Sequence, residues 1–415
     1  MTEYITSDMV LNNLANLPQL VFEVTDACNL KCKYCAYGEL YGFCDKRENQ
    51  KLSIAKAKRI IDYLCAFWNS ERVTSATPLT YISFYGGEPL LNLPFIEEIV
   101  DYIKTGIHCP DRKFVFSMTT NGTLLNQCMD FLAENEFALL VSLDGNQKNN
   151  GYRVDHNGKE SFSKVVENVD LLRERFPEYF KKHVNFNSVF HNLSTMEEVY
   201  SFFKQRYDKV PAINEMNDSC VRRDKVKLFE MMYNETVESL HQSPDHLKIE
   251  NDMSFNGHGY RDFSLYVMRY SGNYFDRYTD LLCDRSNSTL IPTGTCIPFA
   301  KKMFVTVNGK ILPCERIGHQ FGLGQITDTS VELSSESIAL KYNTYYSKVD
   351  KRCASCKIRK ACSQCYFNME SAETNPVCLE FRTEKDMEEL VEKQLDFLRQ
   401  HPKAYREIME EMTFI

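Results

Sequence analysis

The sequence has no long hydrophobic run and no export signal. Its most apolar stretches, such as residues 137–143 (FALLVSL), end within about seven residues, whereas a membrane-spanning helix needs roughly 18. The first twenty residues lack the basic start, continuous apolar stretch and small-residue cleavage site of a secretory signal. We therefore predict a cytoplasmic protein that has no membrane partner.

The sequence also lacks a large excess of charge of one sign. Its 49 Lys and Arg residues stand against 57 Asp and Glu residues, a formal net charge of -8, so we expect no nucleic-acid partner. A content of 43% hydrophobic and 26% charged residues, without low-complexity tracts, excludes a disordered chain. The length of 415 residues predicts two or three domains.

Cysteine, in contrast, is abundant, with 16 residues in the chain. The reducing cytoplasm disfavours disulfides, so these cysteines need another explanation. Eight of them lie between residues 283 and 378. Metal binding is the first candidate.

Short β-rich segments alternate with helical segments from residue 19 to 208. This alternation predicts a parallel sheet with helices outside, curled into a full or partial barrel. The chemistry of such barrels lies where strands end. The expected strands are 19–25, 79–85, 113–119, 137–143 and 184–190, and the expected helices are 53–69, 94–106, 124–135, 161–175 and 195–207.

The remaining chain divides by composition. We predict an extension before the barrel, a polar extension of the barrel that shapes the substrate cavity, a second domain organised by cysteine ligands, and a charged helical tail. These are residues 1–18, 209–282, 283–380 and 381–415, with the barrel core at 19–208.

Three cysteines follow the first expected strand with C-x3-C-x2-C spacing: Cys28, Cys32 and Cys35. Three thiolates on one loop can hold three irons of a [4Fe-4S] cluster and leave the fourth iron open. A zinc site is the alternative, but structural zinc normally takes four ligands and no fourth lies in register here.

This motif after the first strand of a β/α barrel resembles the signature of the radical S-adenosylmethionine (SAM) superfamily. The resemblance implies an α/β fold with a partial (β/α)6 barrel. It also implies that the open iron binds SAM, which one electron cleaves to methionine and a 5'-deoxyadenosyl radical that takes a hydrogen atom from the substrate. The protein positions cofactor against substrate.

Polar residues and glycines at other strand ends agree with this resemblance, which implies that they contact SAM. Gly86, Gly87 and Glu88 resemble the motif that holds the SAM amino group. The residues expected around the ribose, carboxylate and adenine of SAM are Asn121, Ser142, Arg153 and Tyr37. The alternative for Arg153 is a position at the surface, and the alternative for Tyr37 is simple packing.

The downstream cysteines resemble the SPASM domain of radical SAM enzymes, which binds two auxiliary [4Fe-4S] clusters. The resemblance assigns Cys296, Cys314 and Cys365 to the first auxiliary cluster, with Cys283 as a candidate fourth ligand. Only two residues separate Cys362 from Cys365, where the family usually has three, so Cys365 is the least certain ligand. A zinc ribbon is the alternative. The second auxiliary cluster is assigned to Cys353, Cys356, Cys362 and Cys378.

Residues 301–314 predict two strands joined by a turn at Asn308-Gly309, the strongest short hairpin signal. This hairpin would present Cys314 and Glu315 at the barrel mouth. A carboxylate beside a metal ligand is a candidate catalytic base, and the alternative is an ion pair with Arg316 or another cation.

The sequence as a whole resembles SPASM enzymes that form thioether or carbon–carbon crosslinks in ribosomally made peptides. We therefore expect a peptide or protein substrate, an electron donor such as flavodoxin or ferredoxin, and leader recognition by a separate protein, by residues 209–282 or by nothing. Anaerobic sulfatase-maturating enzymes, which oxidise Cys or Ser to formylglycine, are the alternative. They also start almost at the barrel and place an acid after the equivalent of Cys314. A non-catalytic iron–sulfur carrier or zinc scaffold is a third interpretation.

Overall fold

The computed structural model describes residues 2–42, 45–218, 221–253, 258–270 and 290–412. The chain divides into two compact units. The barrel unit comprises Thr6–Pro244 and Cys296–Ala339, and the C-terminal unit comprises Met1–Ile5, Asp245–Thr295 and Leu340–Ile415.

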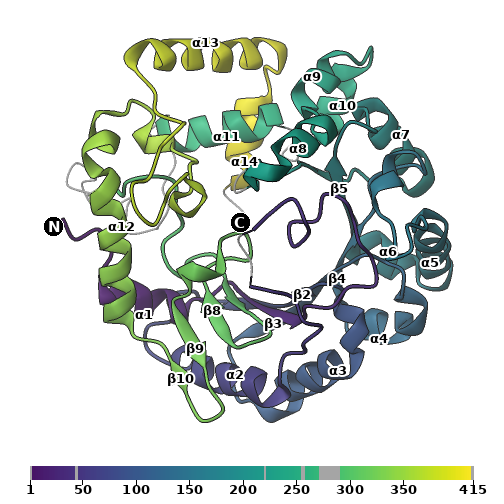
Figure 1. Ribbon diagram of the computed structural model, residues 1–415, viewed down its shortest axis with the longest axis vertical. Coiled ribbons are helices and arrows are strands. Elements are labelled where there is room, and N and C mark those ends of the chain that lie inside the picture. Colours follow the sequence, from purple (N-terminus) through teal and green to yellow (C-terminus); the bar gives the residue numbers. More distant parts are fainter. Residues whose placement is uncertain (1, 43–44, 219–220, 254–257, 271–289, 413–415) are drawn as a thin grey trace. The chain divides into compact units, whose positions relative to one another are not determined.

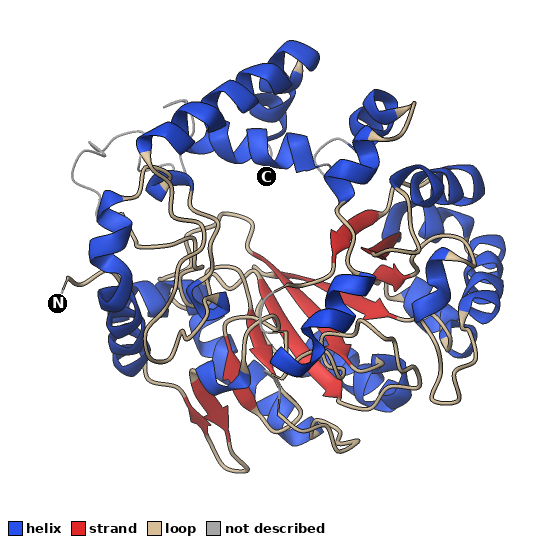
Figure 2. Cartoon of the chain, turned by 45° about the horizontal axis from the view of Figure 1, so that its top comes forward, coloured by secondary structure: helices blue, strands red, loops and turns tan. Residues whose placement is uncertain are grey.

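One sheet forms the centre of the barrel unit, with helices around it (Figure 2). It has ten strands in the order β10-β9-β8-β7-β1-β2-β3-β4-β5-β6. From β1 to β6 each strand pairs in parallel with the next, as the alternation predicts. The six parallel strands are β1 Gln19–Thr25, β2 Leu79–Gly86, β3 Lys113–Thr120, β4 Ala138–Ser142, β5 Val184–Phe190 and β6 Ala212–Glu215. The sixth strand lies beyond residue 208, where we expected the barrel core to end.

Helices α2 to α7 lie along the outside of these strands (Figure 1). Helix α2 shows why: it buries Ala57, Ile60, Ile61, Leu64 and Trp68, which recur at helical spacing on one face. The helices of this unit are α1 Ser7–Ala15, α2 Ile54–Trp68, α3 Leu93–Asp101, α4 Met129–Glu134, α5 Phe162–Arg175, α6 Pro177–His183, α7 Met196–Tyr207, α8 Val226–Met232 and α9 Thr236–His241.

The hairpin predicted at Asn308-Gly309 is present, and it continues the barrel sheet. Strands β7 Met303–Val305 and β8 Lys310–Leu312 pair antiparallel, and β7 pairs in parallel with β1. Gly309 has φ of 82°, a left-handed conformation that glycine adopts without steric cost. Strands β9 Gly324–Ile326 and β10 Val331–Glu332 complete this edge. Residues 296–339 therefore belong to the barrel unit rather than to a separate cysteine-rich domain.

The C-terminal unit is helical, and no named strand lies within its described residues. Its core includes the fully buried Tyr342, Tyr346 and Tyr366. The predicted helical tail is present, and its first helix begins with a capping box between Thr383 and Asp386. The helices are α10 His246–Met253, α11 His258–Tyr270, α12 Ser335–Ser355, which starts in the barrel unit, α13 Glu384–Gln400 and α14 Ala404–Met412.

None of the helices in the described ranges combines the length and the hydropathy that crossing a membrane requires.

Candidate active site

The three cysteines of the first motif lie on one loop directly after β1. All three are half-buried, and their thiols are close enough to interact electrostatically. Burial raises the pKa of Cys28 to about 11 and that of Cys32 to about 12, so both thiols are protonated at neutral pH until a metal displaces the protons.

The side chains that could act as metal ligands near this loop show which metal group would fit it. In the part of the chain that the structure describes, no three Cys, His, Asp or Glu side chains are grouped as the ligands of a metal ion. An iron–sulfur cluster makes a different demand, because its cysteines bind separate corners of a cube and lie farther apart than ligands of one ion. Three neighbouring thiols without a fourth ligand fit a cluster that keeps one iron open.

A second segment, residues 152–156, is hydrogen-bonded to the cysteine loop and is called the strap below. The backbone NH groups of Lys31 and Lys33 donate to the carbonyls of Val154 (2.7 Å) and Tyr152 (3.0 Å). His156 donates from Nε2 to the carbonyl of Cys28 at 2.8 Å. The loop has no regular secondary structure of its own, so these bonds define its path.

Gly86, the last residue of β2, and Gly87, which follows it, allow close contact with the segment that leads to Cys28. A Cβ on Gly86 would lie 2.3 Å from the carbonyl oxygen of Thr25, and a Cβ on Gly87 would lie 1.9 Å from that of Ala27. Both distances are impossible for a larger residue without movement of the backbone. The glycines therefore let the end of β2 pack against the segment after β1, and their expected contact with SAM stays a prediction.

Glu88 is completely buried and joins the ends of β2 and β3. Its Oε1 accepts hydrogen bonds from Thr120 Oγ1 (2.7 Å) and from the backbone NH of Leu90 (3.2 Å), and its Oε2 accepts one from the NH of Asn121 (2.7 Å). Burial raises the pKa of Glu88 to about 7 although these bonds favour the charged form. A carboxylate has about four lone-pair positions, so one more donor, such as an amino group, can still bind.

Asn121 and Ser142 lie at the ends of β3 and β4, as predicted. Asn121 donates from Nδ2 to Asn29 Oδ1 (2.8 Å), and the same nitrogen lies 3.9 Å from the Cys28 sulfur. Asn121 therefore faces the cysteine loop. Ser142 is half-buried and pairs in register with Asn187 of β5.

Tyr37 packs between a cation and a second ring. The Arg47 guanidinium lies 4.2 Å from the centroid of the Tyr37 ring, and the Tyr85 ring lies 6.3 Å from it. Arg47 also forms a 3.1 Å ion pair with the buried Glu23 of β1. The sequence analysis missed Arg47 because nothing in the sequence brings it to Tyr37.

Arg153 is buried rather than at the surface, which excludes the surface alternative. It donates from Nη2 to Asp144 Oδ1 at 2.9 Å, and its guanidinium lies 5.4 Å from the centroid of the Tyr34 ring. Electrostatic interaction with the Cys32 thiol places it beside the cysteine loop. Asp144, Tyr34 and His191 complete this buried group, and none of them was predicted as a site residue.

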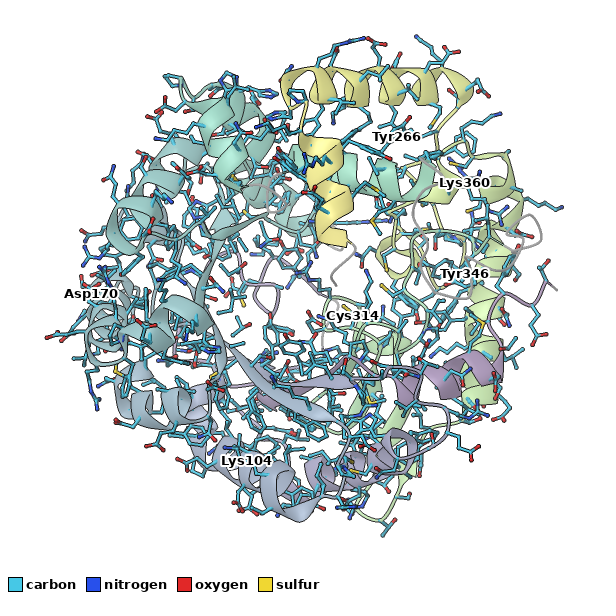
Figure 3. All side chains as sticks on the ribbon, turned by 180° about the vertical axis from the view of Figure 1, so that it is seen from behind. Lys104, Asp170, Tyr266, Cys314, Tyr346 and Lys360 are labelled. Carbon is cyan, nitrogen blue, oxygen red and sulfur yellow. The ribbon has the colours of Figure 1, made fainter. Side chains whose placement is uncertain are left out.

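Glu315 is nearly buried and forms an ion pair with Lys302, in which Oε1 and Nζ are 3.1 Å apart. Burial alone would raise the pKa of Glu315, but Lys302 holds it below its usual value. Glu315 Oε2 lies 3.6 Å from the sulfur of Cys314, which Figure 3 labels. Glu315 and Cys35 both interact electrostatically with the half-buried Tyr85, so Glu315 lies near the cysteine loop.

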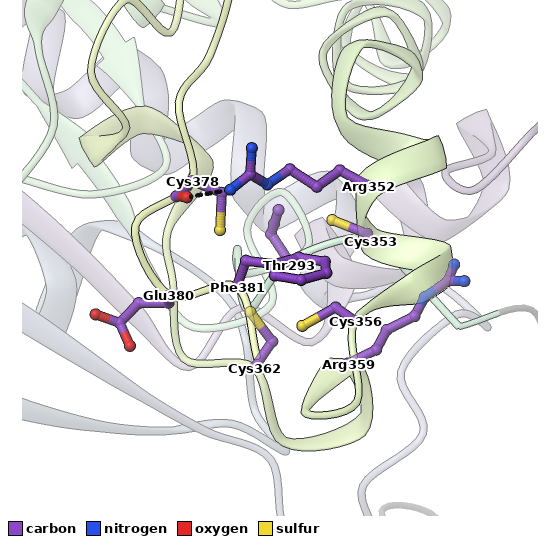
Figure 4. A pocket seen from close by; sticks show the side chains of 9 residues that line it. All are labelled: Thr293, Arg352, Cys353, Cys356, Arg359, Cys362, Cys378, Glu380 and Phe381. Atoms are coloured by element: carbon purple, nitrogen blue, oxygen red, sulfur yellow. Dashed lines mark hydrogen bonds between the residues drawn. The ribbon is translucent and has the colours of Figure 1, made fainter. Parts of the chain in front are cut away.

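Four of the downstream cysteines line one pocket in the C-terminal unit (Figure 4). Arg352 lines it too and donates from Nη2 to the carbonyl of Cys378 at 3.1 Å. Cys365 is not among the lining residues. The four cysteines are the set predicted for the second auxiliary cluster: Cys353, Cys356, Cys362 and Cys378.

The set predicted for the first auxiliary cluster is spread over both units. Cys296 and Cys314 belong to the barrel unit, Cys365 belongs to the C-terminal unit, and Cys283 lies outside the described residues. This ligand set stays a prediction. Five further cysteines were expected to be ordinary thiols. Cys44 and Cys220 lie outside the described residues, and Cys65, Cys109 and Cys128 form no disulfide.

The fold and the cysteine loop define an enzyme of the radical SAM class, and the sequence comparisons agree. Residues 22–205 match the model of the Radical SAM superfamily. The chain is 25% identical, over 86% of its length and 90% of the relative, to a cysteine-type anaerobic sulfatase-maturating enzyme of Clostridium novyi. A relative of the same description from Clostridium perfringens is 28% identical over 88% of this chain and 94% of its own.

Solved structures share the fold. Native anSMEcpe with bound AdoMet, which is SAM, gives a TM-score of 0.61 at 21% identity and covers 93% of this chain and 99% of its own. Streptococcus suis SuiB bound to S-adenosylmethionine gives 0.52 at 16% identity, covering 87% of this chain and 77% of its own.

Residues 22–205 therefore form a radical SAM domain, and the chain is homologous to anaerobic sulfatase-maturating enzymes. It is a radical SAM enzyme, and SAM and [4Fe-4S] clusters are the cofactors of its class, as predicted. Between our two interpretations of the reaction, the comparisons favour the alternative, sulfatase maturation, over peptide crosslinking. A radical SAM cyclopropyl synthase of Paramaledivibacter caminithermalis matches only 40% of this chain, at 27% identity.

Proposed function

We propose that the enzyme oxidises a cysteine of an unfolded sulfatase segment to formylglycine. Similarity to cysteine-type sulfatase-maturating enzymes over 86% of the chain is the observation that carries this proposal. Its support from the site is the carboxylate of Glu315 directly after Cys314, at the position where such enzymes place an acid.

In this proposal Cys28, Cys32 and Cys35 hold the barrel cluster. Bound SAM would supply one-electron cleavage and abstraction of one hydrogen atom from the substrate. The second electron would pass to an auxiliary cluster, and water would replace the sulfur, which leaves as hydrogen sulfide. The chain's contribution is to orient SAM through Glu88, whose remaining lone pair suits the amino group, and through the neighbouring Asn121 and Ser142. The raised pKa of Glu88 means that an ammonium group bound there also stabilises its charged form.

Glu315 is the proposed base for the thiol proton of the substrate cysteine. Lys302 keeps its carboxylate ionised at neutral pH, so it is ready to accept a proton. The same ion pair was our alternative for Glu315, and the geometry allows both: Oε1 faces Lys302 while Oε2 lies beside Cys314.

We also propose a second cluster in the pocket of Cys353, Cys356, Cys362 and Cys378. The four thiols in its lining suit iron and sulfide. An electron donor such as flavodoxin or ferredoxin would supply the electron for SAM cleavage. A separate leader-binding protein is required only if the substrate is a leader-bearing peptide.

The mass of the peptide product tests this proposal. The anaerobically reconstituted enzyme is incubated with SAM, dithionite and a synthetic sulfatase-motif peptide that contains Cys, with Ser and Ala peptides as controls. Formylglycine appears as loss of hydrogen sulfide and gain of one oxygen in the Cys peptide. A product that has lost only two hydrogen atoms would support crosslinking instead, and 5'-deoxyadenosine without any peptide product would refute the sulfatase assignment.

A further inference from the structure

A buried carboxylate, Asp144, lies where three segments of the barrel unit meet. It lies just after β4 and is completely buried. Its Oδ1 accepts hydrogen bonds from Arg153 Nη2 (2.9 Å) and from the backbone NH of Val189 in β5 (2.9 Å). Its Oδ2 accepts the hydroxyl of Tyr34. One side chain thus joins the cysteine loop, the strap and strand β5.

Tyr34 is the group through which this carboxylate reaches the cysteines. It lies between Cys32 and Cys35 in sequence and is 7% exposed. Its ring stacks on His191 at a centroid distance of 5.5 Å and an interplanar angle of 30°. With its ring packed and its hydroxyl bonded, Tyr34 leaves the loop between these two cysteines little freedom.

His191 faces the same carboxylate. Its Nδ1 accepts a hydrogen bond from the NH of Leu193 (3.3 Å), so a neutral imidazole carries its proton on Nε2, 3.6 Å from Asp144 Oδ2. His191 is completely buried, and the centroid of the Tyr152 ring lies 4.7 Å from that of the imidazole. Tyr152 belongs to the strap, so the imidazole also connects Tyr34 with the strap.

The charges of Asp144 and Arg153 balance each other. Burial alone would raise the pKa of Asp144, but the guanidinium of Arg153 more than offsets this and holds it below its usual value. A buried carboxylate that loses its cation, or a cation that loses its carboxylate, is costly, so the two side chains keep each other in place. Arg153 is flanked by Tyr152 and Val154, whose carbonyls hold Lys33 and Lys31.

We propose that Asp144 is a positioning residue for the barrel cluster: with Arg153 and His191 it holds Tyr34 and the strap, and thereby the cysteine loop, in the shape that binds iron. Arg153 acts through Asp144 in this arrangement. The proposal goes beyond sulfatase maturation, because it concerns assembly of the cofactor site whatever the substrate is. Partners of this kind typically change metal affinity about 10- to 100-fold when removed.

The experiment compares Asp144→Asn, Tyr34→Phe and their double variant with the wild-type holoenzyme after anaerobic reconstitution. The readouts are iron per chain, the SAM-dependent change in the EPR spectrum of the reduced barrel cluster, and the melting temperature. We expect at least about tenfold weaker SAM response in Asp144→Asn, a smaller loss in Tyr34→Phe, and no further loss in the double variant, because both changes break one connection.

Arg112→Met is the matched control. Arg112 is a buried arginine of the same unit and donates to Thr80 Oγ1 and the Ala15 carbonyl, both 2.7 Å away at the entrance of β2 rather than its end. The Arg112→Met substitution should lower the melting temperature and leave the EPR response unchanged. The proposal is overturned if Asp144→Asn behaves like this control, or if the losses in the double variant add. Should Asp144→Asn fail to fold, Tyr34→Phe, which keeps the ring, decides alone: an unchanged EPR response refutes the proposal.

Discussion

The two cysteine-rich sites differ in what holds them. The loop with Cys28, Cys32 and Cys35 follows β1 and rests on the ends of three further parallel strands, through Gly87 after β2, Asn121 after β3 and Asp144 after β4. The pocket with Cys353, Cys356, Cys362 and Cys378 is built from the end of α12, a single 3-10 turn and loops. The barrel site therefore has a scaffold of its own, whereas the C-terminal pocket depends on what its thiols bind.

The number of thiols differs as well. Three cysteines leave one iron of a cube open for chemistry, and four close it. We infer that a rigid scaffold accompanies the proposed open cluster, while the proposed closed cluster organises the chain around it.

The largest effect that we predict is on the barrel site. Replacing Cys28, Cys32 and Cys35 with Ala should lower 5'-deoxyadenosine formation at least about 10³-fold and remove about four of about twelve irons per chain. Cys128→Ala, a buried cysteine outside both sites, is the control and should change neither quantity. Retained 5'-deoxyadenosine formation in the triple variant would contradict the assignment of the open cluster.

The second prediction concerns the C-terminal cysteine pocket. Cys353→Ser together with Cys356→Ser should remove about four irons and expose the backbone amides of residues 352–381 to hydrogen exchange, because little regular structure holds them. The amides of β1 to β4 should keep their protection, and SAM cleavage should persist. Equal loss of protection in both units would show that the scaffolds are not independent.

The third prediction separates SAM cleavage from the later chemistry. Glu315→Gln should lower formylglycine formation about 10²-fold because the amide cannot accept the thiol proton. Formation of 5'-deoxyadenosine should continue, so the two products become uncoupled in a chromatographic assay. Glu336→Gln, an exposed acid on α12, is a control that should leave both rates unchanged. A parallel loss of both products would assign Glu315 to SAM binding or cluster assembly instead.

The smallest effect concerns Glu88 in the apoprotein. Its pKa is about 7 when folded against a usual 4.5, so the folded state favours the protonated form. Stability from this group is complete below pH 4.5 and is lost as the pH rises through 7, by roughly 2 kcal/mol between pH 5 and pH 8. Thermal unfolding of wild type and Glu88→Gln over this range measures it. A wild-type pH dependence as flat as that of the variant would contradict the prediction.

The alternating pattern predicts the parallel core closely. Strand β1 has the predicted bounds 19–25, and β4 is shorter than predicted by one residue at each end. The resemblance to a (β/α)6 barrel implies a sixth strand, but the pattern did not locate β6 because its four residues, AINE, are too short and too polar to show a strand pattern. The pairing of β7 with β1 escaped for another reason: it joins segments about 280 residues apart, which no local pattern records.

The same limit applies to the candidate site. The cysteine spacing predicts the residues that bind the clusters, and strand ends point to Glu88 and Asn121. Neither reveals that Glu88 bonds to the end of β3 or that Lys302 faces Glu315.

The sequence by itself determined the class of enzyme and the order of the barrel, and it predicts the cysteine sets, because these depend on spacing along the chain. Only the tertiary structure decided that the glycines after β2 pack against the cysteine loop and that Asp144 joins Tyr34, Arg153 and Val189. The physical reason is that strand ends far apart in sequence meet at one edge of a parallel sheet. Burial there makes each polar group depend on partners that the sequence does not place beside it.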